Sequence, residues 1–179
     1  AADINSVIAL VSSLERKETR LGRSSYVVTS KGAEVKTAFK VVDASSLIIS
    51  NNLDGTINPA FPEELQPRDR TRLSSKLQVN RIASNLRPAQ LTDSGMSSHG
   101  APIVGPDNVV ESGNGRSMGI WRAYEQGQAD EYRQYLIDHA KEFGLNPDEI
   151  SQMSMPVLVR ERLTDVDRAQ FARDSNISD

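Results

Sequence analysis

The sequence predicts an α+β fold in which a small mixed β-sheet carries flanking helices. Two observations support this class. Short runs of alternating apolar residues predict strands, whereas apolar residues at helical spacing predict helices, and the two kinds of segment alternate along the chain. The predicted strands are few and short, so the expected sheet is small.

The N-terminal residues 3–20 are predicted to form an amphipathic helix, because apolar side chains recur there at helical spacing. Asp3 is a suitable N-cap residue, and Gly22 stands where a glycine commonly ends a helix. We expect this helix to belong to an N-terminal extension, residues 1–34, and the main domain to span residues 35–179.

Two strands are predicted next, at residues 26–29 and 35–42, and the second shows the two-residue alternation of a half-buried strand. Prolines are dense between residues 51 and 67, which prevents regular structure there. Phe61 and Leu65 are the apolar residues expected to attach this irregular segment to the core.

The remaining elements are predicted from helical periodicity, β-branched runs and turn residues. In order, they are a helix at 70–86, a hairpin at 102–104 and 109–111, a helix directly after residue 116, a helix at 129–143, a short Asn-Pro-capped turn at 146–147, a strand at 157–159 and a helix ending near 175 with Asp165 as its cap.

Composition limits the chemistry that the chain can perform. Its 179 residues suffice for one core, and the absence of cysteine excludes disulfides, thiolate zinc sites and thiol nucleophiles. No apolar stretch is long enough to cross a bilayer, so we expect no membrane association and a cytoplasmic location. The net charge is −3, but residues 68–87 hold a local excess of basic side chains. This excess is expected either to meet phosphate groups or to form a solvated helix face.

The segment from Glu111 to Arg116 joins a predicted strand to a predicted helix and contains two glycines. Glycine permits positive φ and a close approach of the backbone to a ligand, and a helix N-terminus directs N–H groups toward an anion. Arg116 adds a planar cation suited to phosphate. The spacing fits neither a Walker A loop nor the dinucleotide fingerprint. The segment therefore predicts an anion site, with a tight turn bearing a surface arginine as the alternative.

Residues 110–123 resemble the strand–glycine–arginine–helix signature of the ParB/sulfiredoxin superfamily. Residues 65–68 look like the proline–arginine segment of that family, and residues 155–160 look like its "V-P-A-I-V-R" strand. Residues 58–70 and 111–116 are similar to the ddrB-type ParB-like domain found in large polyvalent proteins of phages and conjugative plasmids. The resemblance covers residues 35–179 and implies a ParB/sulfiredoxin-like fold.

The resemblance also implies a ligand, because ParB relatives hold the triphosphate of a cytidine nucleotide in the glycine–arginine loop. Asn114 stands where the family carries a charged residue, so the preferred base is not transferred, and sulfiredoxin chemistry is excluded because the loop has no cysteine. Asp174 and Asn176 are the residues expected to bind magnesium. The nucleotide-binding residues expected on this basis are Arg68, Ser112, Gly113, Asn114, Gly115, Arg116 and Asn176.

The leading functional hypothesis is a nucleoside-triphosphate-binding domain, using CTP or ATP with Mg²⁺, in a DNA-handling protein of a mobile element. It would act as a nucleotide-dependent switch or NTPase, with DNA bound through other domains of a longer protein and with a homodimer as an expected assembly. One alternative is a nuclease or other phosphoryl-transfer enzyme that uses Glu111 with Asp174 or Asn176. The other is a protein-interaction module that has lost the ligand. His99 and His139 are expected to have no functional role.

Overall fold

A five-stranded mixed sheet organises the chain in the computed structural model, which describes residues 17–51, 56, 58–65 and 79–175. The sheet order is β1-β2-β5-β3-β4, with antiparallel pairing throughout except for the parallel pair β3–β5. The strands are β1 Ser24–Val28, β2 Glu34–Asp43, β3 Ile103–Val104, β4 Val110–Ser112 and β5 Pro156–Arg162. The predicted α+β class with a mixed sheet is confirmed.

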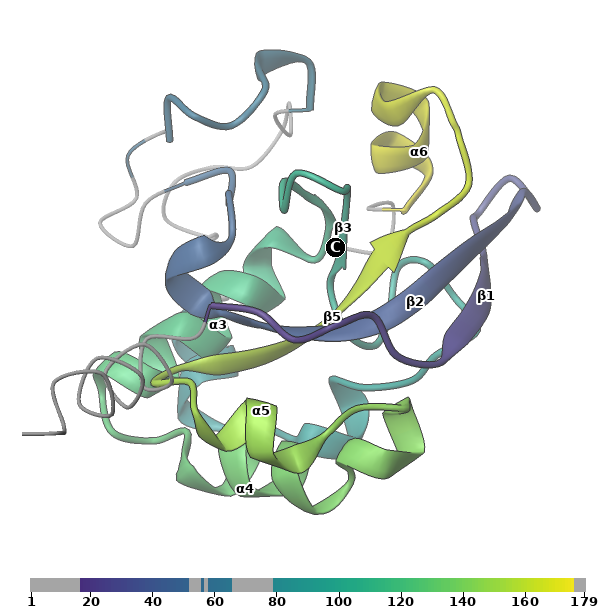
Figure 1. The fold of residues 1–179 in the computed structure, drawn as a ribbon. Helices are drawn as coiled ribbons and strands as arrows, with labels where there is room; N and C mark the ends of the chain where they lie inside the picture. Colours follow the sequence, from purple (N-terminus) through teal and green to yellow (C-terminus); the bar gives the residue numbers. More distant parts are fainter. Residues whose placement is uncertain (1–16, 52–55, 57, 66–78, 176–179) are drawn as a thin grey trace, which may run out of the picture.

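The helices flank this sheet on both sides (Figure 1). The 3-10 turns are η1 Ala44–Ser46, η2 Glu63–Leu65, η3 Pro88–Gln90 and η4 Ala140–Phe143, and residues 79–84 are also helical. The other α-helices of the described residues are α3 Asn114–Glu125, α4 Asp130–Asp138, α5 Pro147–Ser151 and α6 Arg168–Ser175. In Figure 1, α4 and α5 lie below β2 and β5, whereas α6 lies above them.

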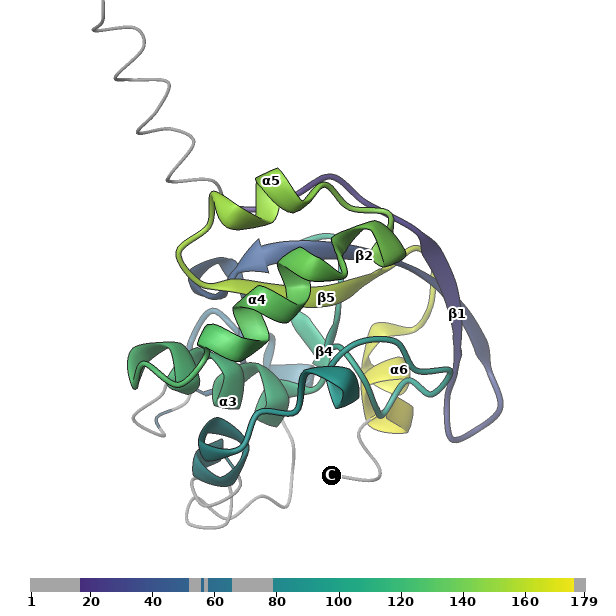
Figure 2. The same cartoon turned by 90° about the horizontal axis from the view of Figure 1, so that it is seen from below.

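The central strands are buried because both of their faces are covered. Consecutive residues Val157, Leu158 and Val159 of β5 are all buried, as expected for a strand packed on both faces. Helix α4 passes across β5 in Figure 2, and the Tyr132 hydroxyl of this helix accepts a hydrogen bond from Leu158 N at 3.0 Å. These contacts fix the helical layer on the strand that also carries Arg160.

The irregular proline-rich segment is attached to the core as predicted. Phe61 and Leu65 are buried and pack with Val109 and Ala172 in a separate small cluster. The predicted hairpin is also confirmed, since β3 and β4 pair antiparallel around a turn in which Asn108 has a φ of 64°.

The N-terminal prediction is wrong where it can be checked. Residues 17–20 are not helical, because Glu18 forms an antiparallel bridge with Val42 of β2 and Gly22 N donates to Phe39 O at 2.7 Å. Backbone pairing with β2 replaces the end of the helix, and residues 1–16 lie outside the described part of the chain. Strand β1, which we expected in the extension, belongs to the main sheet.

Two helix boundaries also differ from the prediction. The predicted helix 129–143 is interrupted, because α4 ends at Asp138 and a 3-10 turn follows up to Gly144, whose φ is 72°. The cap of α6 is Asp167, whose Oδ1 accepts a hydrogen bond from Gln170 N at 3.2 Å, rather than Asp165. Among the described residues, no helix is long and apolar enough to cross a membrane.

Candidate functional site

The predicted strand-to-helix junction is present and depends on Gly113. This residue lies between β4 and α3 with a φ of 92°, in the left-handed region that glycine adopts without strain. A Cβ at Gly113 would lie 2.9 Å from Nη2 of Arg116. The Arg116 side chain therefore folds back over the glycine, and the two positions are sterically linked.

The backbone of this junction lies inside the protein. Ser112, Gly113, Asn114 and Gly115 are all buried, and only Arg116 of the predicted phosphate loop is partly exposed. The Ser112 hydroxyl donates to carbonyl oxygens of two other segments, and Asn114 Oδ1 accepts from a backbone N–H at 2.8 Å. The structure thus brings the predicted loop residues together, and Arg116 extends from them into a surface pocket.

Two buried hydroxyl groups beside the junction have no hydrogen-bond partner among the described residues. Ser112 Oγ bonds to Ser97 O at 2.7 Å and to Ser175 O at 3.1 Å, which places both residues next to the loop. In the described structure the hydroxyls of Ser97 and Ser175 are buried and unpaired. A buried unpaired hydroxyl costs roughly 1–3 kcal/mol.

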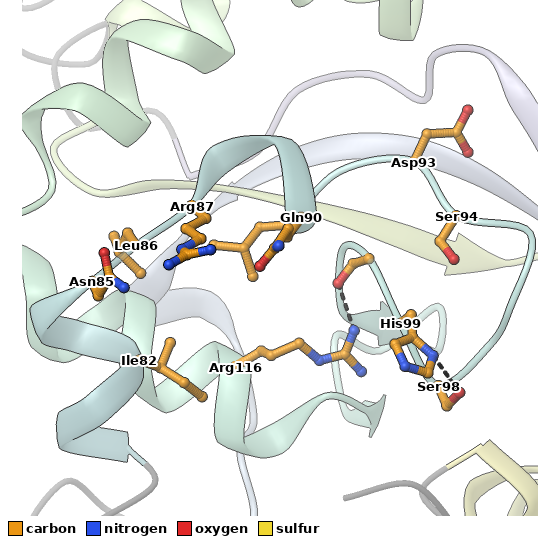
Figure 3. Close-up of a pocket in the computed structure, with 12 residues that line it drawn as sticks. Ile82, Asn85, Leu86, Arg87, Gln90, Asp93, Ser94, Ser98, His99 and Arg116 are labelled. Atoms are coloured by element: carbon orange, nitrogen blue, oxygen red, sulfur yellow. Dashed lines mark hydrogen bonds between the residues drawn. The ribbon is translucent and has the colours of Figure 1, made fainter.

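The pocket that Arg116 reaches has a volume of about 580 Å³, within the usual range for small-molecule sites. Figure 3 shows Arg116 extending from α3 toward a loop that carries His99, with Arg87 on the opposite wall. The pocket thus combines cationic, amide, hydroxyl and aliphatic groups. Its lining residues are Ile82, Asn85, Leu86, Arg87, Gln90, Leu91, Asp93, Ser94, Ser98, His99, Gly100 and Arg116.

The guanidinium of Arg116 is held at the edge of the pocket. Its Nη1 donates to Gly100 O at 2.5 Å, and its Nη2 lies 3.4 Å from Ser112 Oγ. These bonds connect the start of α3 to the pocket loop. They orient the cation while leaving it among the pocket-lining residues.

A second guanidinium, that of Arg160, lies behind the pocket loop. Arg160 is fully buried on β5 and donates to the backbone carbonyls of Ser94, His99 and Ala101. Burial, together with the positive charge of Arg116, lowers the pKa of Arg160 to about 9, although the negative charge of Asp93 acts in the opposite direction. Two arginines therefore lie near one another, and this region of the protein favours an anion.

Glu111, the predicted general base, lies in an ion-pair cluster instead of the pocket. Its side chain is buried, and its carboxylate accepts from Arg162 Nε at 2.7 Å and from Arg168 Nε at 2.7 Å. Arg168 also bonds to Asp107, and this hydrogen bond lowers the pKa of Asp107. A general base must reach its substrate. The geometry therefore gives Glu111 a structural role.

Of the two predicted magnesium ligands, Asp174 lies in the described part of the chain. Asp174 is buried, and its Oδ1 accepts from Gln170 Nε2 at 2.9 Å. No group of three or more His, Cys, Asp or Glu residues is placed there to hold a metal. Arg68 and Asn176, the other predicted ligand-binding residues, lie outside the described residues.

Three residues of this region were not selected from the sequence. Arg87 ends the basic run that the sequence does show, so charge patterning could have nominated it. His99 was expected to have no role, yet it lines the pocket. No local sequence pattern predicts a site role for Arg160, because its hydrogen-bond partners come from residues 94–101, about sixty positions earlier in the chain.

Comparison with known proteins adds one finding. The family model of the ddrB-like ParB superfamily domain matches residues 30–163. The matched region includes the strand-to-helix junction, the pocket loop and Arg160. No curated protein and no solved structure shows a significant match to the chain.

Proposed function

The chain belongs to the ddrB-like ParB superfamily, and we propose that it binds a nucleoside triphosphate, CTP or ATP, in the pocket beside Arg116. One observation carries the proposal. Arg87 and Arg116 line opposite walls of a pocket of about 580 Å³ that also has an aliphatic wall. Guanidinium groups bind phosphate oxygens through charge-assisted hydrogen bonds, and aliphatic side chains accept the face of a base.

The distribution of side chains suggests an orientation for the ligand. Phosphate groups would lie between Arg116 and the loop that carries Ser98 and His99. The base would lie toward the wall formed by Ile82 and Leu86. The neighbouring amide side chains of this wall, Asn85 and Gln90, offer donors and acceptors for the edge of the base.

Magnesium would arrive with the triphosphate. Mg²⁺ is usually held by substrate phosphates, water and one or two carboxylates, so it needs few protein ligands. Asp93 is the carboxylate among the pocket-lining residues, and it already pairs with Arg23 at 3.1 Å. The residues present therefore fit a metal held mainly by the nucleotide, with its positive charge reducing the repulsion between phosphate groups.

Binding would be coupled to conformation through Arg116. Its Nη1 holds Gly100 O, and a phosphate that draws the guanidinium into the pocket competes for the same donor. The loop around Gly100 would then be released or reset. Such a change would alter the surface offered to neighbouring domains and to DNA, which is how the domain would act as a nucleotide-dependent switch in a DNA-handling protein of a phage or plasmid.

A binding function has more support than hydrolysis or nuclease activity. Glu111, the residue on which the nuclease alternative depended, is buried and paired with two arginines. A homodimer remains part of the proposal only through the family resemblance. We therefore propose binding and switching, with no catalytic base assigned.

Calorimetry with CTP, ATP and GTP, each with Mg²⁺, tests the proposal. We expect saturable binding of at least one nucleotide, and we expect Arg116→Ala to weaken it by roughly tenfold or more, because a charge-assisted hydrogen bond contributes about 1.5–3 kcal/mol. Arg133→Ala is the matched control, since Arg133 donates to Ser151 O and Met153 O outside the pocket. Failure of all three nucleotides to bind would contradict the proposal and favour an interaction module.

A further inference from the structure

The loop from Ser94 to Ala101 forms one wall of the pocket, and its backbone is held from behind by Arg160. Arg160 Nε donates to Ala101 O at 2.9 Å, and Nη1 donates to Ser94 O at 2.9 Å. Nη2 donates to Ala101 O at 2.6 Å and also to His99 O. One rigid guanidinium thus connects both ends of the loop to β5.

The two arginines divide the loop carbonyls between them. Arg160 holds the carbonyls of His99 and Ala101, and Arg116 holds the carbonyl of Gly100 between them. The loop is tightly folded at this point, because Gly100 has a φ of 82° and a Cβ there would lie 2.7 Å from Thr92 O. Because these carbonyls bond to the guanidinium groups, the groups that the loop offers to the pocket are side chains, among them those of Ser98 and His99.

Within the described chain, every hydrogen bond of the fully buried Arg160 ends on a carbonyl oxygen and none on a carboxylate. A buried cation that bonds to no carboxylate is costly, and the nearby charge of Arg116 adds to this cost while that of Asp93 partly offsets it. A well-packed apolar side chain would stabilise the sheet more, but it could not hold three carbonyl groups. The arrangement therefore favours a role in shaping the loop.

We propose that Arg160 is a positioning residue of the pocket, which sets the loop so that Ser98 and His99 face Arg116 across the space for phosphate. Figure 3 shows the His99 ring of this loop beside the guanidinium of Arg116. The Ser98 hydroxyl and His99 Nδ1 lie 2.8 Å apart, which orients the ring. The inference rests on the proposed function, because it assigns Arg160 to the same ligand site.

The test compares R160K with R133K in the full chain. Lysine keeps the charge, but its three donors share one nitrogen and cannot span the carbonyl groups that the three nitrogens of the planar guanidinium reach. Arg133 is the matched control, because it also donates to two backbone carbonyls but lies outside the pocket. Calorimetry with pyrophosphate and with Mg²⁺–CTP or Mg²⁺–ATP gives the affinities, and NMR follows the ring signals of His99 and His139, the two histidines of the chain.

We expect R160K to weaken pyrophosphate and nucleotide binding by about tenfold or more and to abolish the ligand-induced shift of the His99 signal. The His139 ring stacks on Tyr135 outside the pocket, so its signal is the internal reference. R133K should bind as the wild-type chain does. Wild-type affinity and a normal His99 shift in R160K would overturn the inference and leave the proposed function standing.

Two further outcomes are decisive. If the wild-type chain binds neither pyrophosphate nor nucleotide, the proposed function fails and this inference fails with it. If R160K does not fold, H99Q replaces it, because the exposed side chain of His99 is not needed for the core. Loss of affinity in H99Q by fivefold or more supports a loop that presents ligand contacts, whereas unchanged affinity overturns that role.

Discussion

At the scale of single residues, Glu111 and Arg116 show how burial separates structural from ligand-binding charges. Both belong to the same strand-to-helix junction. Glu111 is 1% exposed and bonded to Arg162 and Arg168, whereas Arg116 is partly exposed and lines the pocket. The ion pairs of Glu111 hold α6 and the turn before β4 to the sheet. The partly exposed Arg116 is a cation that a ligand can approach.

Glu111→Gln is therefore expected to destabilise the protein without removing a catalytic group. The amide keeps the shape of the carboxylate but leaves the partly buried Arg162 without the counter-charge of Glu111 and leaves Arg168 paired with Asp107 alone. Breaking a buried ion pair in this way typically costs about 3–5 kcal/mol. Urea unfolding measures the loss, with the exposed Glu131→Gln as the control. A change below about 1 kcal/mol would contradict the structural role.

At the scale of elements, the junction between β4 and α3 depends on a backbone conformation that other residues reach only with strain. Gly113 has a φ of 92° and lies under the Arg116 guanidinium, 2.9 Å from the position of a Cβ. The same glycine thus turns the chain into α3 and leaves room for the cation. Backbone geometry and ligand binding are linked at this position.

Gly113→Ala tests this link. We expect a loss of about 1–2 kcal/mol in the free energy of unfolding, which is the usual cost of the left-handed region for a residue with a Cβ. We also expect weaker nucleotide binding, because the methyl group displaces Arg116. Gly32→Ala is the matched control, since Gly32 has a φ of 81° but no atom within 4 Å of the added Cβ. It should lose comparable stability and keep wild-type affinity; equal affinity in the two variants would refute the link.

At the scale of the whole molecule, the buried Tyr132 and the partly buried Tyr124 attach the helices to β5. Tyr124 of α3 donates to Pro156 O at 2.6 Å, and Tyr132 of α4 accepts from Leu158 N at 3.0 Å. Burial raises the pKa of both phenols above the ordinary value of 10.0. The folded chain therefore keeps these protons at a pH where the unfolded chain releases them.

This difference predicts a loss of stability at alkaline pH. Because the pKa of Tyr124 is raised in the folded chain, its contribution to the free energy of unfolding is complete below pH 10.0, the ordinary pKa of a phenol. Above pH 10.0 this contribution decreases by about 1.4 kcal/mol per pH unit. Arg160 acts in the opposite direction, since its folded pKa is about 9 and its ordinary value is 12.5. Tyr124→Phe should therefore flatten the decrease in urea-unfolding free energy above pH 10. Tyr26→Phe, at a residue 56% exposed, should leave it unchanged.

Much of the local structure could be predicted from the sequence because its causes are local. Alternating apolar residues predicted β2, turn residues predicted the β3–β4 hairpin, and a strand–glycine–helix pattern predicted the junction at Gly113. The prediction was wrong at residues 17–20, where pairing with β2 overrides helical periodicity. The resemblance to the ParB superfamily, confirmed over residues 30–163, rests on the same short motifs.

The sequence by itself determined the α+β class, the strand-to-helix junction and the nomination of Arg116. Only the tertiary structure decided that the junction backbone is buried, that Glu111 is paired, and that Arg87, His99 and the loop before β3 complete the pocket. The physical reason is the distance along the sequence over which each kind of interaction acts. Periodicity and turn chemistry act over a few residues, whereas the hydrogen bonds of Arg160 to the loop and of Arg168 to Glu111 join residues about sixty positions apart.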